Sequence, residues 1–159
     1  MSDFTFSQLK YERPDYDMVE KECKKMVEDI KNAKSYGDIK DVLERRERLY
    51  STIATMSTIA YIRNTLDTTD EFYEKEVEFI NEREAEAEIA MTEVSKALLE
   101  CGFTEDIAAD FGPEFLVIEK REVDKFREEL VPYKQKEAKL TMRYQKIMAT
   151  ARIEFDGKT

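Results

Sequence analysis

The sequence of 159 residues contains no histidine and no tryptophan, and only four glycines and three prolines. Histidine is the commonest general base and transition-metal ligand, so its absence excludes Ser-His and Cys-His nucleophile pairs and the zinc motif H-E-x-x-H within these residues. The scarcity of glycine and proline disfavours many short strands joined by tight turns. A protein of long helices is expected, and any chemistry it has either needs no histidine or lies outside these residues.

Basic residues are also in deficit, with 26 Lys and Arg against 36 Asp and Glu and a formal net charge of -10. Binding to nucleic acid or to an anionic membrane would normally need the opposite balance, so we expect no nucleic acid and no membrane as partners. No signal peptide is visible in the first ten residues, and a cytoplasmic location follows. The two cysteines, Cys23 and Cys101, are expected to be reduced thiols.

Apolar residues recur at helical spacing along most of the chain. They predict helices over residues 15–33 and 38–66, a third that follows the link at residues 67–71 and ends near residue 100, and a short one over residues 104–111. Two more helices follow, separated by Pro132, and the second ends near residue 151. The link between the two longest helices is so short that they must run antiparallel. The predicted fold class is all-α: a long antiparallel helical hairpin within a bundle of about five to six helices.

Three side-chain features sharpen this prediction. Thr68 and Glu71 have the spacing of a capping box at the start of the third helix. Arg63 and Asp67 lie four residues apart, which predicts an ion pair beneath the link. Arg46 falls on the apolar stripe of the second helix and needs either an acidic partner or solvent.

Residues 49–62 carry no charge and include five serines and threonines. The stretch is too short to span a membrane. It predicts a central helix that is covered on most sides, with hydroxyls bonding back to the preceding turn. The alternative is a helix that lines a groove.

Pairs of carboxylates three residues apart are frequent and could hold Mg²⁺, as in the all-helical nucleotide pyrophosphatases. The pairs are Glu44 with Glu47, Asp67 with Asp70, and Glu71 with Glu74. Because acids are so abundant here, a solvated surface with pairing to Lys and Arg is the favoured interpretation. At the other end of the chain, residues 152–155 alternate as a strand does, and Asp156-Gly157 is a hairpin signal with only two residues after it.

Three stretches make the chain resemble the N-terminal region of the oligoendopeptidase F family, zinc metallopeptidases related to thimet oligopeptidase. They are residues 11–15 (YERPD), residues 63–76 (RNTLDTTDEFYEKE) and residues 151–159 (ARIEFDGKT). The resemblance implies a helical N-terminal domain over residues 1–151. It also implies that residues 152–159 begin a hairpin that leads to a catalytic domain, so that the chain is truncated before the H-E-x-x-H part.

In the family, the H-E-x-x-H helix and a distal glutamate bind zinc, and no position here matches them. No catalytic residue and no metal ligand can therefore be carried over, and zinc is implied only for the full-length parent. The resemblance implies that this region walls a channel that admits short peptides. Its partners would be the catalytic domain and oligopeptide substrates, and a homodimer could form through apolar surface left exposed. Candidate channel-lining residues are Tyr61, Phe72 and Tyr73, with the uncharged face of residues 49–62.

Two other functions stay open from the residues alone. One is a free-standing helical protein-interaction module, which predicts little exposed apolar area. The other is the Mg²⁺-dependent nucleotide pyrophosphatase suggested by the carboxylate pairs.

Overall fold

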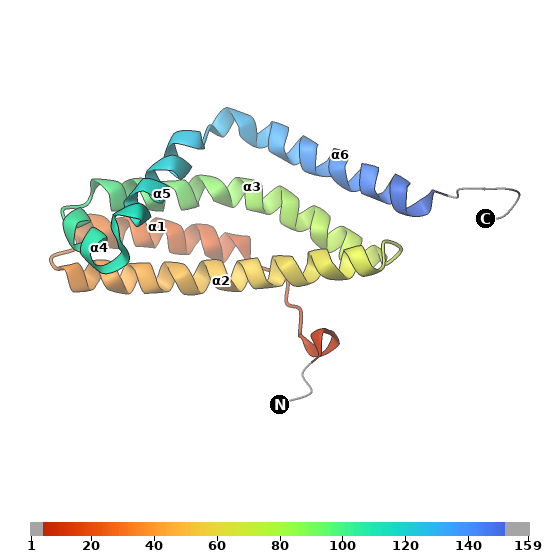
Figure 1. The fold of residues 1–159 in the computed structure, drawn as a ribbon, viewed down its shortest axis with the longest axis horizontal. Coiled ribbons are helices and arrows are strands. Elements are labelled where there is room, and N and C mark those ends of the chain that lie inside the picture. Colours follow the sequence, from red (N-terminus) through yellow and green to blue (C-terminus); the bar gives the residue numbers. More distant parts are fainter. Residues whose placement is uncertain (1–4, 152–159) are drawn as a thin grey trace, which may run out of the picture.

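The computed structural model describes residues 5–151, which form six α-helices and two short 3-10 turns, with no strand among them (Figure 1). The helices are α1 (Tyr16–Asn32), α2 (Tyr36–Leu66), α3 (Glu71–Glu100), α4 (Thr104–Phe111), α5 (Pro113–Lys125) and α6 (Val131–Thr150), and the 3-10 turns cover Phe6–Gln8 and Glu128–Leu130. The all-α prediction and the long antiparallel hairpin, formed by α2 and α3, are confirmed. The predicted strand in residues 152–159 lies outside the described residues.

Side chains at the helix starts explain where the chain turns. Ser35 and Asp38 form a reciprocal capping box at the start of α2, which sequence inspection missed. The capping box predicted for Thr68 and Glu71 is wrong. The Asp70 carboxylate caps α3 instead, accepting hydrogen bonds from the amides of Phe72 at 2.9 Å and Tyr73 at 3.4 Å. Because Asp70 directly precedes the first helical residue, its short side chain reaches the free amides of the first turn.

The main hydrophobic core lies where α1 packs between α2 and α3, and it is closed at one end by α4 and α5 (Figure 1). Its fully buried side chains include Val19, Met26, Ile39 and Leu98. Cys23 also lies in this core, and burial raises the pKa of its thiol to about 11. Both cysteines are free, as expected.

Arg46 finds the acidic partner that its position in the apolar stripe required. Its Nη2 lies 2.7 Å from Oε1 of Glu119 in α5, and the two side chains are only 14% and 7% exposed. This buried ion pair connects α2 to α5 at the end of the bundle that α4 and α5 close.

The second half of α2 is less covered than predicted. Ser51, Thr55, Thr58 and Tyr61 are all exposed, because α1 lies beside only the first part of this helix (Figure 1). The expected back-bonding does occur: the Thr55 hydroxyl donates to the Ser51 carbonyl at 2.7 Å. The uncharged stretch therefore has an open, hydroxyl-rich side, whereas Ile53, Ile59 and Ala60 on its other side are buried.

α6 runs along α3 as an outer layer (Figure 1), and Val131 is its one buried residue. Within residues 5–151, no helix has the length and apolar character needed to cross a membrane.

Candidate functional site

The N-terminal segment is fastened to α3 by a buried carboxylate. Glu76, which is 2% exposed, accepts a hydrogen bond from the Tyr11 hydroxyl at 2.7 Å and another from Nε of Arg13 at 2.9 Å. Arg13 holds the pKa of the Glu76 carboxyl below its usual range. Two of the stretches that carry the family resemblance, residues 11–15 and 63–76, thus contact each other directly.

Arg63 provides a second attachment for the same segment. Its guanidinium donates to the Leu9 carbonyl and to the Tyr73 hydroxyl, and it lies 5.3 Å from the centre of the Tyr73 ring. The predicted ion pair between Arg63 and Asp67 is wrong. Asp67 instead accepts from the Thr69 amide and hydroxyl at 2.9 and 2.6 Å, within the link itself.

The three candidate channel residues occupy two separate places. Phe72 and Tyr73 belong to an aromatic cluster with Tyr11, in which the ring centres are 4.9 to 6.2 Å apart. Tyr61 does not join this cluster. Its hydroxyl donates to the Asn81 side chain, whose amide in turn lies 3.3 Å from the sulfur of Met142 in α6.

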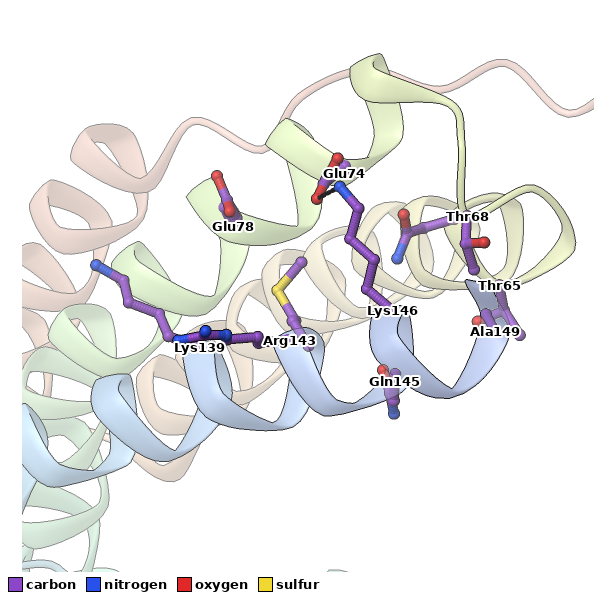
Figure 2. Close-up of a pocket in the computed structure, with 11 residues that line it drawn as sticks. Thr65, Thr68, Glu74, Glu78, Lys139, Arg143, Gln145, Lys146 and Ala149 are labelled. Atoms are coloured by element: carbon purple, nitrogen blue, oxygen red, sulfur yellow. Dashed lines mark hydrogen bonds and ion pairs between the residues drawn. The ribbon is translucent and has the colours of Figure 1, made fainter. Parts of the chain in front are cut away.

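A cleft of about 450 Å³ opens between the end of α2, the start of α3 and α6 (Figure 2). Asn64, Thr65 and Thr68 line it from the α2 side, and Glu74 and Glu78 line it from α3. The α6 wall consists of Lys139, Met142, Arg143, Gln145, Lys146 and Ala149. Tyr61 is not among the residues that line this cleft, and it is connected to Met142 of the α6 wall only through Asn81. Phe72 contacts Tyr11 of the N-terminal segment.

Charges of both signs meet in the cleft. Lys146 Nζ lies 2.6 Å from Glu74 Oε1, a contact drawn in Figure 2, and Lys139 Nζ lies 2.5 Å from Glu82 Oε1. These hydrogen bonds raise the pKa of both lysines. Lys139 and Lys146 were not predicted as site residues, although their seven-residue spacing places two cations on one helix face in an acidic chain.

The acidic pairs considered for Mg²⁺ do not gather in the described part of the chain. Residues 5–151 contain no group of three or more His, Cys, Asp or Glu side chains placed to hold a metal ion. Glu44 pairs with Arg48, Glu71 pairs with Lys75, and Asp70 caps α3. The cleft therefore offers hydrogen-bonding groups and charges of both signs for binding.

The family model described as the peptidase M3 N-terminal domain matches residues 6–126. The chain belongs to this peptidase M3 N-terminal domain family. The match covers α1 to α5 and ends where the helical run breaks, before α6. None of the curated protein sequences compared with the chain matches it significantly.

The similarity to solved structures extends over almost all of this chain, including α6. PZ peptidase A, solved with an inhibitor, is 28% identical with a TM-score of 0.91, and the match covers 97% of this chain and 27% of that one. An oligoendopeptidase F from Bacillus anthracis is 28% identical with a TM-score of 0.90, covering 97% of this chain and 28% of its own. A further oligoendopeptidase F gives a TM-score of 0.91 at the same identity, with 98% and 27% coverage. The chain thus spans little more than a quarter of these relatives.

Proposed function

We propose that this M3 N-terminal domain acts as the helical wall of a cytoplasmic zinc oligoendopeptidase that hydrolyses short peptides. The observation that carries the proposal is the family match together with the similarity to oligoendopeptidase F structures over 97% of the chain. Because the chain covers only 28% of that relative, the catalytic part is assigned to polypeptide beyond these residues. The M3 domain itself then binds and positions, and does not cut.

The residues present do not fit a zinc ion. The sequence has no histidine, and the described residues gather no cluster of potential ligands. Zinc would be bound by residues of the catalytic part, where it would activate water for peptide hydrolysis.

The cleft between α2, α3 and α6 has the chemistry that an extended peptide requires. A peptide backbone presents donors and acceptors in equal number, and Asn64, Thr65 and Gln145 supply both. The charged ends of a short peptide need groups of both signs, which Glu74 and Lys146 provide. We propose that the cleft forms part of the peptide channel.

Among the candidate channel residues, we propose Tyr61 as a substrate contact because it is exposed and its hydroxyl bonds to Asn81, whose amide contacts Met142 of the cleft wall. Phe72, which is also exposed, would be a second contact on the other side of α3. The hydroxyl of Tyr73 is already engaged by Arg63, so we propose a positioning role for this ring.

The proposal is tested first by the mass of the native polypeptide, detected with an antibody against this chain. We expect a band several times heavier than 18.8 kDa. The purified polypeptide should contain zinc and hydrolyse a quenched peptide until a chelator is added, whereas the isolated 159-residue chain should do neither. A native band at 18.8 kDa, or chelator-insensitive hydrolysis, would overturn the proposal.

The role of Tyr61 has a separate test in the native polypeptide. Tyr61→Ala should raise KM for a peptide substrate severalfold, because a wall contact is lost. The matched control is Tyr36→Ala, since Tyr36 bonds to Asp110 of α4, away from the cleft. Equal effects of the two changes would show that Tyr61 has no particular role in substrate binding.

The two alternative functions have less support. A free-standing module predicts little exposed apolar area, yet α6 exposes Leu140, Tyr144, Ile147 and Met148. The pyrophosphatase requires a carboxylate cluster that residues 5–151 do not form.

A further inference from the structure

α6 has two apolar faces, and only one of them is covered within the described residues. Val131, Ala138 and Met142 recur at helical spacing and are buried or half-buried against α3. A second set lies on the opposite side of the helix, since it is offset by about half a turn. We name this set the outer stripe; it comprises Tyr133 (70% exposed), Leu140 (56%), Tyr144 (63%), Ile147 (57%) and Met148 (59%).

Three ion pairs also attach α6 to α3. Lys134, Lys139 and Lys146 contact Glu88, Glu82 and Glu74 at 2.6, 2.5 and 2.6 Å. The three pairs follow the antiparallel register of the two helices. Because exposed ion pairs contribute little stability, these three pairs orient α6 on α3 more than they stabilise its packing there. An α-helix normally buries its most apolar side, whereas α6 turns its outer stripe to solvent.

The border of the outer stripe is basic. Lys136 and Arg143 lie on one flank of the stripe and are exposed, and neither forms an ion pair within the part of the chain that the structure describes. A surface that covers the stripe would therefore meet an apolar centre and a cationic edge. Its complement is an apolar patch bordered by carboxylates.

α6 lies just beyond the end of the N-terminal domain match. The N-terminal domain family model ends at residue 126, and α6 begins at Val131 after the 3-10 turn Glu128–Leu130. The similarity to solved structures nevertheless covers 97% of the chain, although it spans 27% of the PZ peptidase A chain. About three quarters of that relative lies beyond the matched region, which is ample polypeptide to cover one helix face.

We propose that α6 is an interdomain helix. Its outer stripe packs against a surface of the catalytic part of the same polypeptide, and that surface is apolar at its centre and bordered by carboxylates. α3 covers one side of α6 and the catalytic part covers the other. Carboxylates of that part face Lys136 and Arg143. This inference rests on the proposed function, because it takes the existence of a catalytic part from it.

Hydrogen exchange on the native polypeptide tests the inference without any peptidase assay. We expect amides of residues 140–150 to exchange at least tenfold more slowly in the native polypeptide than in the isolated 159-residue chain. Amides of α1 should exchange at the same rate in both, since its core is complete. Equal rates for residues 140–150 in the two samples would overturn the inference and leave the proposed function intact.

A pair of variants identifies the surface. In the native polypeptide, Leu140→Glu with Ile147→Glu should abolish the added protection of residues 140–150. The matched control is Val117→Glu with Ile118→Glu, which places two charges at similarly exposed apolar positions of α5 (51% and 57%) and should leave that protection unchanged. The same loss in both variants would contradict a specific role for the outer stripe.

A native band at 18.8 kDa would remove the proposed function, and sedimentation of the 159-residue chain then decides what covers the stripe. A dimer that Leu140→Glu with Ile147→Glu dissociates would make the occupant a second copy. A monomer would leave the stripe uncovered. Either result overturns the interdomain assignment.

Discussion

Arg13 and Glu76 are 63 positions apart in the sequence, yet Nε of the arginine lies 2.9 Å from Oε2 of the glutamate. The two partners differ sharply in exposure, with the Arg13 side chain 53% exposed and the Glu76 side chain 2% exposed. The carboxylate is thus buried, and the guanidinium covers it from the solvent side. This relationship fixes the N-terminal segment on α3 and orders the aromatic cluster of Tyr11, Phe72 and Tyr73.

The unequal burial predicts an unequal response to mutation. Arg13→Met should destabilise the chain by about 2 kcal/mol, because it leaves a buried carboxylate without its cation. Glu76→Gln should cost about 1 kcal/mol, since Arg13 can turn to water while the amide still accepts from Tyr11. The double variant should be no less stable than Arg13→Met alone, as urea unfolding of all four proteins would reveal. Additive losses would mean that the two side chains are not coupled.

The same carboxylate predicts how stability depends on pH. Because Arg13 lowers the pKa of folded Glu76, the folded chain binds fewer protons here than the unfolded chain does in mildly acidic solution. The contribution is fully present above the ordinary glutamate pKa, and it is lost as the pH falls through the lowered folded value. Wild type should therefore lose more stability than Glu76→Gln between about pH 5 and pH 3. Parallel stability curves for the two proteins would contradict this assignment.

The helices could be predicted from the sequence because each depends on local periodicity. The third helix, for example, was predicted to follow the link at residues 67–71 and to end near residue 100, and α3 covers Glu71–Glu100. The capping residue at a helix start was predicted wrongly where two nearby polar side chains could both cap the helix, as Thr68 and Asp70 could for α3. Exposure of the second half of α2 could not be predicted, because it depends on how far α1 extends beside it.

The candidate site was harder to predict because it depends on contacts between distant residues. Arg13 and Glu76 are ordinary charged residues in an acidic chain, and nothing in their spacing pairs them. The cleft exists only because α6 runs back along α3, which brings Lys146 to Glu74 across 72 positions. Phe72 and Tyr61 were both expected to line the channel, yet they contact different sides of α3.

Replacement of the residue that caps α3 provides a third prediction. Asp70→Ala should destabilise the chain by about 1 kcal/mol, because two amides of the first turn lose their acceptor. Thr68→Ala is the matched control, and it should change stability by less than about 0.3 kcal/mol, since Thr68 does not cap the helix. Thermal unfolding of both variants measures the difference. A larger loss for Thr68→Ala would restore the capping box that the sequence suggested.

The buried pair between Arg46 and Glu119 provides the last prediction. Arg46→Met should destabilise the chain by about 3 kcal/mol, because Glu119 then remains buried without its cation. Replacement of both partners, Arg46→Met with Glu119→Leu, should recover most of that loss, since an apolar pair has no charge to desolvate. The matched control is Arg48→Met, which removes an exposed pair with Glu44 and should cost no more than about 0.5 kcal/mol. Urea unfolding measures all three, and a double variant as unstable as Arg46→Met would show that the ion pair itself contributes the stability.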